Sequence, residues 1–515
     1  MKTLRFPFYP FVLFVAFPIQ LFANNVGIFD GFSVIRLLVC LLAVCGIVFA
    51  MLRLVTRRLD LAACITALLP VVASTFQPIP MNVLSFAAAA LLIGYGISAL
   101  NLTRPMVAIA NLVSLSLLIT PVTRIVSAEV FAASTNAEPL HFGPIADLGP
   151  AAFAGRPAWP SVVHIVLDAY GGQTALKKLF GHDNAPFSDA LRGLGFVVLE
   201  DVAAPYNQTL PAMSAVMNAD FPPLDTPPLS EMSSVNLRAV LARSVIEGSA
   251  IRAFRSQGHQ VVYTASGYGA FEYPRSAQLI STRVGAFELS QFDVYFLVLH
   301  LDRWGINVVE PTTRTAPLDR QVRDALSLDL MDKLESPFFL YSHILAPHPP
   351  FTMDRGGNST NRWGFSLLAD GDHTIGNDES LRRSYREGYI EKLRYVNAAV
   401  LAQVTQMIDR VEDPLIIIIQ GDHGSGSLLI QDSAERTCLM ERMRTTVAVY
   451  SNVPEIRAAV AAGGIDNTVN IYRVIFSALS GTKIPSVEGQ YFSKWSALNQ
   501  PLSLAGADFD RNCER

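Results

Sequence analysis

The stretch that decides the fold is Leu415-Ile416-Ile417-Ile418-Ile419-Gln420-Gly421-Asp422-His423-Gly424. Its first five residues are apolar and mostly β-branched, which predicts a short strand buried on both faces, as in a parallel sheet. The strand ends by placing Asp422 beside His423. Ligands of α/β proteins bind at the carboxyl ends of strands, where a carboxylate next to an imidazole forms half of a metal site. A simple turn that ends the strand is the alternative for this motif alone.

A second buried strand is predicted at Val162–Leu167, and Asp168 follows it directly. Two parallel strands that each end in a carboxylate can bring these oxygens to one point. A divalent ion needs about four such ligands. We therefore expect Asp168, Asp422 and His423 to lie around one ion.

A hydroxyl group opens a predicted helix in the segment Ala204–Met217. Pro205 and Asn207 favour a turn, and Thr209 then begins an apolar helical pattern. A hydroxyl at the first turn of a helix lies at the positive end of the helix dipole, where a phosphate or sulfate also binds. The alternative is that Thr209 only caps the helix.

A third strand is predicted at Phe338–Ile344, with His343 inside it and His348 in the proline-rich loop beyond it. The prolines restrict the backbone of this loop and so fix the direction of His348. A surface loop with an incidental histidine is the alternative.

The remaining pattern predicts an α/β fold with a mostly parallel central sheet. A helix is expected over about Ser384–Val411, where apolar residues recur at spacings of three and four. It leads into the predicted strand Leu415–Ile419, so it is the crossover helix of a β-α-β unit. Further strands are predicted at Phe196–Leu199, Gln260–Thr264 and Thr446–Tyr450.

The first part of the chain has the composition of a membrane region. The 515 residues are 50% hydrophobic and only 16% charged. Five apolar stretches each approach the ~20 residues of a membrane-crossing helix: Phe6–Phe22, Val34–Leu54, Leu59–Phe76, Val83–Leu100 and Met106–Ile125. Basic residues between them predict a cytoplasmic N-terminus and a periplasmic or extracellular remainder. A cleaved signal peptide is the alternative for the first stretch.

We divide the chain into a five-helix transmembrane region (1–126), a linker rich in Ala, Pro and Gly (127–160), a catalytic domain (161–500) and a C-terminal tail (501–515). The predicted spans carry almost no ionisable residues, which disfavours a transporter. No basic excess indicates nucleic-acid binding. Cys438 and Cys513 form an even pair outside the membrane region and either join in a disulfide or remain thiols.

These motifs, in this order, resemble the alkaline phosphatase/sulfatase superfamily, and in particular its membrane-anchored members such as lipoteichoic acid synthases and phosphoethanolamine transferases. The resemblance covers about Ser161–Trp495, including Val469–Phe476. It implies one divalent ion, Zn or Mn, a threonine nucleophile, and a histidine that holds the substrate oxyanion or its leaving group. The implied metal ligands are Asp168, Thr209, Asp422 and His423, the implied catalytic residues are Thr209 and His348, and the substrate-binding candidates are His343, His348 and Asn207.

Three departures refine what the resemblance implies. The segment Thr209-Leu210-Pro211-Ala212-Met213 lacks the Cys or Ser that sulfatases convert to formylglycine, and it lacks their arginine. There is no Asp-x-x-x-His pair for a second ion, and Ala169 stands where sulfatases often have a second Asp. We therefore expect a one-ion phosphotransferase or phosphodiesterase with a membrane lipid or lipid-linked donor and a cell-envelope glycan or water as acceptor. The alternative is a non-catalytic sulfatase-fold module that binds or scaffolds.

Overall fold

The computed structural model describes residues 6–26, 31–75, 104–134, 142–148, 158–227, 229–265, 271, 278–280, 322–325, 327, 334–360, 370–431, 433–489, 491–493, 502–503 and 508–514. The chain divides into two compact units, one made of the N-terminal helices and the other built around a β-sheet. Each unit is described by itself.

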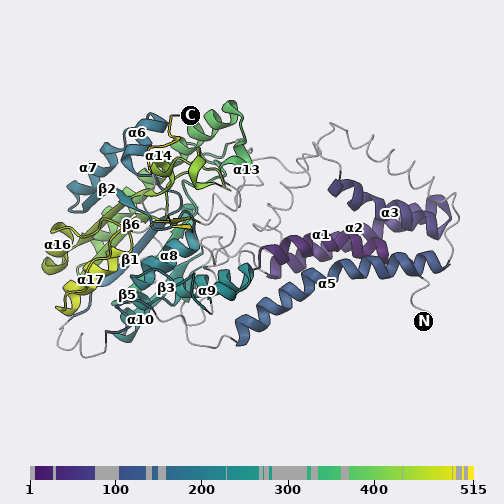
Figure 1. Cartoon of the computed structure of the whole chain (residues 1–515), viewed down its shortest axis with the longest axis horizontal. Helices are drawn as coiled ribbons and strands as arrows, with labels where there is room; N and C mark the ends of the chain where they lie inside the picture. Colours follow the sequence, from purple (N-terminus) through teal and green to yellow (C-terminus); the bar gives the residue numbers. More distant parts are fainter. Residues whose placement is uncertain are drawn as a thin grey trace. The chain divides into compact units, whose positions relative to one another are not determined.

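The N-terminal unit consists of apolar helices (Figure 1). Helices occupy four of the five predicted stretches: α1 (Tyr9–Asn24), α2 (Gly31–Thr56), α3 (Leu59–Thr75) and α5 (Arg104–Ser134). The predicted stretch Val83–Leu100 lies outside the described residues. By length and composition, α2 and α5 can cross a membrane, whereas α1 and α3 are apolar but shorter. Two candidate spans are therefore established within the described part, and the count of five stays a prediction.

The second unit contains a seven-stranded sheet in the order β2-β7-β6-β1-β5-β3-β4. Central strand β1 (Ser161–Leu167) pairs in parallel with β5 (Phe338–Ile344) and with β6 (Leu415–Gly421). The other strands are β2 (Val197–Ala203), β3 (Gln260–Thr264), β4 (Gln278–Ile280) and β7 (Arg444–Ser451). All six predicted strands are present, and β4 is an addition.

The sheet is mixed, so the prediction of a mostly parallel sheet was wrong. Strand β7 runs antiparallel to both of its neighbours, β2 and β6. A parallel strand needs a long crossover, such as helix α14 (Glu379–Arg410) between β5 and β6. The described residues of the connection from β6 to β7 contain a three-residue 3-10 turn and the four-residue helix α15 (Leu439–Arg442), which are too short to cross the sheet. The chain therefore turns back at the carboxyl end of β6.

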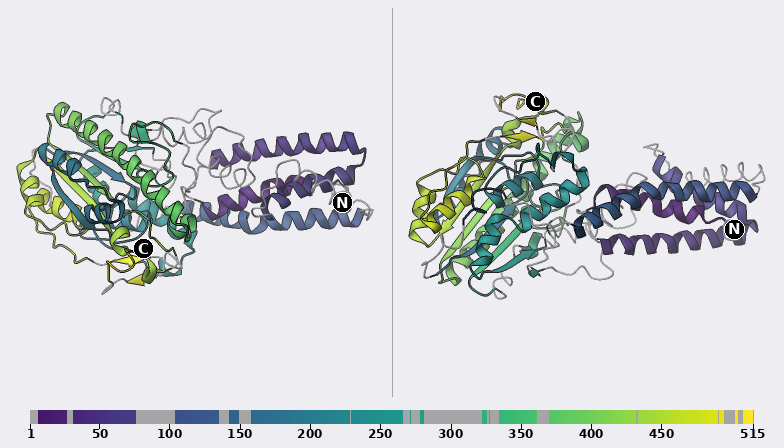
Figure 2. Two further views of the ribbon diagram at one scale, coloured as in Figure 1. Left: turned by 90° about the horizontal axis from the view of Figure 1, so that it is seen from above. Right: turned by 60° about the horizontal axis from the view of Figure 1, so that its bottom comes forward.

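Helices cover both faces of the sheet, as the views in Figure 2 show. The side chains of β1 alternate between the two layers, with Val162 and Val166 on one face and Val163 and Ile165 on the other. The second of these faces is covered by α6 (Gln173–Phe180), α7 (Ala185–Gly193) and the long α14. The first is covered by α8 (Thr209–Asn218), α9 (Ser234–Ile246), α10 (Ser249–Ser256), α16 (Pro454–Ala461) and α17 (Asn470–Ser480).

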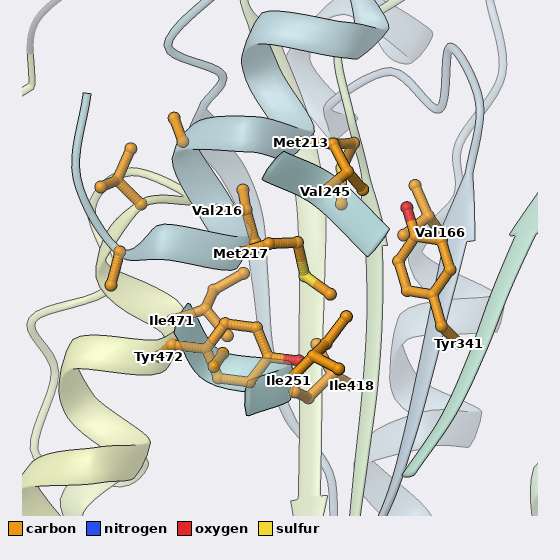
Figure 3. Packing of buried hydrophobic residues seen from close by; sticks show 14 of the residues in the cluster. Val166, Met213, Val216, Met217, Val245, Ile251, Tyr341, Ile418, Ile471 and Tyr472 are labelled. Atoms are coloured by element: carbon orange, nitrogen blue, oxygen red, sulfur yellow. The ribbon is translucent and has the colours of Figure 1, made fainter. Parts of the chain in front are cut away.

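Helix α8 is fixed by its apolar side chains, all of which are buried after its first residue. In Figure 3, Met213 and Met217 of this helix pack among Val166, Tyr341 and Ile418 from three neighbouring strands. Each fully buried side chain of this size contributes about 1.5–3 kcal/mol through removal from water. This packing holds the helix against the sheet and thereby fixes the position of its first residue.

The remaining elements are short: α13 (Asp372–Ile375), the 3-10 turns Leu229–Glu231 and Ala434–Arg436, and the pair β8 (Phe492–Ser493) and β9 (Leu502–Ser503). Cys438 and Cys513 form a disulfide, which resolves the alternatives left open by the sequence. This bond ties the C-terminal residues to the start of α15.

Candidate active site

Two carboxylates meet at the carboxyl edge of the sheet. In the β1–β6 register Leu167 lies opposite Gly421, so the next residue of each strand, Asp168 and Asp422, leaves the sheet at the same level. Both side chains are buried. Ligand atoms of Asp168, Asp422 and His343 all lie within 4.8 Å of one another. The parallel pairing predicted from the sequence thus brings these acids together.

Each of these carboxylates keeps one oxygen without a hydrogen-bond donor among the described residues: Oδ1 of Asp168 and Oδ2 of Asp422. The other oxygen of Asp422 accepts from the backbone N–H groups of Ala169, at 3.0 Å, and His423, at 2.9 Å. A buried anionic oxygen without a partner is costly. The two free oxygens therefore fit a bound cation, and carboxylate with imidazole is a donor set suited to Zn or Mn.

His343 lies within hydrogen-bond distance of one of the two acids. Its Nε2 is 3.2 Å from Oδ2 of Asp168, and its Nδ1 is 3.4 Å from the Tyr341 hydroxyl. The sequence assigned this residue to substrate binding. Its distance to Asp168 makes it a candidate metal ligand as well.

The imidazole of His423 has one nitrogen available as a ligand close to Asp422. Its Nδ1 lies 3.0 Å from the carbonyl oxygen of Gly424, so this nitrogen carries the proton and Nε2 keeps its lone pair. Nε2 is 3.3 Å from Oδ2 of Asp422 and 3.5 Å from Oγ1 of Thr209. Burial, followed by the charge of Arg442, lowers the pKa of His423, so the neutral, ligating form is favoured.

Thr209 is the first residue of α8, and it is not the helix cap. Gln208 occupies the cap position, and it makes no side-chain cap bond. The Thr209 hydroxyl faces His423, as its distance to Nε2 shows. The capping alternative therefore fails, and the hydroxyl stands at the positive end of the helix, next to His423.

His348 lies next to Asp168 in the loop after β5. Its backbone N–H donates to the carbonyl of Asp168 at 3.1 Å, and its Nδ1 is 2.7 Å from the Pro349 carbonyl. Burial alone would raise the pKa of Asp168, but the nearby His348 and the hydrogen bond with His343 hold it below its ordinary value. The buried ammonium group of Lys392 fixes the loop by donating to three of its carbonyls, those of Leu345, His348 and Pro350.

The last of the predicted residues, Asn207, is also buried near the site. Its backbone carbonyl accepts from Nε of Arg442 at 3.1 Å. The turn predicted around Asn207 thus contacts α15, the short helix between β6 and β7.

The sequence did not reveal three buried charged residues, Glu441, Asp370 and Arg442, which hold the segment after β6 in place. Glu441 accepts from Ser425, Ser427 and Leu428, and burial raises its pKa. Asp370 accepts from the Tyr385 hydroxyl and from Nη1 of Arg442, both at 2.9 Å. None of the three charged residues follows a strand. The one available signal was a Glu-Arg pair between apolar residues in Leu439–Met443.

Glycine at position 424 is required by the close approach of this loop to α15. A Cβ atom there would overlap the carbonyl oxygen of Glu441. The Asp-His-Gly sequence is therefore determined both by the chemistry of its first two residues and by the packing of its third.

Comparison with known proteins gives one family match. The family model described as Sulfatase matches residues 257–451, which include His343, His348, Asp422 and His423 and leave Asp168 and Thr209 outside. No curated protein sequence matches the chain.

Several solved structures are similar at low scores. The zinc complex of the C-terminal periplasmic domain of EcEptC from Escherichia coli aligns with 70% of this chain and 97% of its own, at 9% identity and a TM-score of 0.42. The integral membrane lipooligosaccharide phosphoethanolamine transferase A (EptA) from Neisseria meningitidis aligns over 93% and 96%, at 12% identity and a TM-score of 0.40. The periplasmic domain of phosphoethanolamine transferase EptC from Campylobacter jejuni aligns over 63% and 89%, at 10% identity and a TM-score of 0.35.

Proposed function

We propose that this chain, whose residues 257–451 match the Sulfatase family model, is a membrane-anchored enzyme of the alkaline phosphatase/sulfatase superfamily that transfers or hydrolyses phosphate esters through Thr209. One observation carries the proposal. The Thr209 hydroxyl, at the start of α8, lies 3.5 Å from Nε2 of His423, which in turn lies 3.3 Å from the buried carboxylate of Asp422. These distances support a role for the Thr209 hydroxyl as a nucleophile next to side chains that could bind a metal ion.

The residues that would hold the ion are Asp168, Asp422, His423 and Thr209, with His343 as a further ligand. The unpartnered oxygens of the two acids support this assignment. When bound, a divalent cation lowers the pKa of a coordinated hydroxyl and neutralises phosphoryl oxygens. One ion suffices for this role, and Zn or Mn suits the donor set.

The chain's own groups would then divide the reaction into two steps. In the first, Oγ1 of Thr209 releases its proton to solvent water and forms a bond to phosphorus, while the bond from phosphorus to the leaving oxygen breaks. His348 supplies a proton to that leaving oxygen from Nε2, because its Nδ1 is engaged with the Pro349 carbonyl. In the second step, water or an acceptor hydroxyl attacks the phosphorus of the phosphothreonine and passes its proton to Nε2 of His348. The bond from phosphorus to Oγ1 breaks and releases Thr209 as an alkoxide.

Phosphate esters are favoured over sulfate esters by the nucleophile itself. Sulfatases of this superfamily use a formylglycine made from Cys or Ser, and position 209 is a threonine. A threonine hydroxyl can attack phosphorus directly without such a conversion. The position of this hydroxyl next to His423 also disfavours a purely scaffolding role, because a scaffold does not need a hydroxyl there.

Two features support a lipid substrate outside the cytoplasm. Helices α2 and α5 are long and apolar enough to cross a membrane, which would keep the enzyme at the lipid surface. The Cys438–Cys513 disulfide supports a periplasmic or extracellular domain, because disulfides persist in oxidising compartments. We therefore propose a membrane lipid or lipid-linked donor, with a cell-envelope glycan or water as acceptor.

The experiment incubates the full-length protein with head-group-labelled phospholipids and searches for phosphorylated Thr209 by mass spectrometry. Thr209→Ala should abolish both the label and turnover while leaving metal content largely intact, because the other ligand side chains remain. Thr209→Ser, which keeps a hydroxyl, is the matched control and should retain labelling. Full turnover by Thr209→Ala would remove this residue from the mechanism.

A further inference from the structure

Arg442 is a buried arginine whose guanidinium group is held on two sides by the protein. Only 5% of the residue is exposed. Nε donates to the Asn207 carbonyl at 3.1 Å, and Nη1 donates to Asp370 at 2.9 Å and to the Gly424 carbonyl at 3.1 Å. The donors that remain for another partner are therefore those on Nη2.

Nη2 of Arg442 points at the nitrogen of His423 that would bind the ion. The distance from Nη2 to Nε2 of His423 is 3.3 Å. Because Nδ1 of His423 donates to Gly424, Nε2 has a single lone pair to offer. That lone pair cannot accept from Arg442 and coordinate a cation at once. Whenever His423 ligates an ion, a buried guanidinium N–H loses its acceptor and needs another.

One place for that acceptor is at Thr209. Oγ1 of Thr209 lies 3.5 Å from the same Nε2 of His423, so the nucleophile and Nη2 of Arg442 flank one nitrogen atom. A phosphoryl group that binds to Thr209 carries its non-bridging oxygens into this space. A guanidinium group suits such oxygens, because its N–H donors are fixed in a plane and always charged.

We infer that Arg442 is a substrate-binding residue that donates from Nη2 to a non-bridging phosphate oxygen held at Thr209. This role rests on the proposed function. Asp370, Asn207 and Gly424 act as positioning groups, because they occupy the other N–H donors and leave Nη2 directed toward the nucleophile. The short helix α15 therefore contributes to the site although it follows no strand.

The test measures binding of inorganic phosphate to the metal-loaded, full-length protein by calorimetry, with metal content and melting temperature determined for every variant. Arg442→Gln should weaken phosphate binding about 10- to 100-fold, the range of a charge-assisted hydrogen bond, while metal content stays unchanged. Arg442→Lys keeps the charge without the planar fork and should weaken binding several-fold.

Arg473→Lys is the matched control. Arg473 is equally buried and bonds to backbone carbonyls, but one of these belongs to Ala219, beyond the opposite end of α8 from Thr209. Its substitution should leave phosphate binding unchanged.

The outcomes separate the two proposals. Wild-type phosphate affinity in folded, metal-loaded Arg442→Lys and Arg442→Gln would overturn the role of Arg442 and leave the proposed function standing. If Arg442→Gln does not fold, the lysine variant decides alone, and unchanged affinity again overturns the role. A metal-loaded wild-type protein that binds no phosphate would remove both the anion site and the proposed function.

Discussion

Replacing Asp422 by Asn should make the ion-free protein more stable, whereas the same replacement at Asp370 should make it less stable. Ligand oxygens of Asp168 and Asp422 lie within 4.8 Å in a buried site. At that distance and an effective dielectric constant of about 20, two unit charges repel by about 3.5 kcal/mol. The charge of Arg442 near His423 offsets part of this repulsion, so we expect Asp422→Asn to relieve about 1–3 kcal/mol.

The substitution preserves the structural role of Asp422. Its Oδ1, which accepts from Ala169 and His423, remains an oxygen in asparagine. Only Oδ2, which has no donor among the described residues, becomes an amide nitrogen. The variant therefore loses a metal-binding charge without losing a hydrogen bond.

Asp370 is the matched control because its carboxylate is fully engaged. It pairs with Arg442 at 2.9 Å and accepts from the Tyr385 hydroxyl. Asp370→Asn leaves the guanidinium of Arg442 buried without a counter-charge, which costs about 3–5 kcal/mol.

The assay follows unfolding of the full-length protein in chelator and in added zinc, together with metal analysis. Wild type should be stabilised by zinc, by about 2.7 kcal/mol when free zinc is 100 times its dissociation constant. Asp422→Asn should melt above the wild type in chelator and gain little from zinc. If it instead melts as low as Asp370→Asn in chelator, or binds zinc as the wild type does, Asp422 is a structural residue and the metal site is refuted.

Two further predictions concern the disulfide and a buried histidine. Cys438→Ser combined with Cys513→Ser opens a loop closed across 75 residues and should lower stability by about 4 kcal/mol. The melting temperature of this variant is compared with that of untreated and reduced wild type. An unchanged melting temperature would show that the tail is held by packing alone. Burial lowers the pKa of His164 to about 3. Below pH ~6.5 the unfolded chain therefore binds a proton at His164 that the folded protein does not bind. The free energy of unfolding falls as the pH is lowered from there. The loss should reach about 2 kcal/mol at pH 5 and should be absent in His164→Gln, so equal pH dependence of melting in variant and wild type would contradict it.

The parts of the site that follow strands could be predicted, because their signal is local. A run of β-branched residues predicts a buried strand, and the polar residue directly after it must emerge at the sheet edge, as Asp168 and Asp422 do. The superfamily resemblance added Thr209 and His348, whose catalytic roles stay predictions, and the family match supports the resemblance itself.

The parts that could not be predicted depend on the length and packing of connections. Between Gly424 and Arg444 the described residues form no helix longer than four residues, and this decides the direction of β7. Hydrophobic periodicity within a strand is the same for either direction. Arg442 and Asp370 lie 72 positions apart in the sequence and meet only because the loop after β6 folds onto α15. No local pattern encodes such a pair.

Ala169 explains how the site differs from that of the sulfatases it resembles, which often carry a second Asp at this position. The residue adopts a left-handed conformation, with φ of 62°, and is fully buried. Its N–H donates to Asp422 and its carbonyl accepts from the Tyr389 hydroxyl at 2.8 Å, so its backbone orients one acid and supplies no ligand. The nearest replacement is the imidazole of His343, 3.2 Å from Asp168. A set with two imidazoles and two carboxylates favours zinc more strongly than one with a single imidazole, which shifts the expectation from zinc or manganese toward zinc.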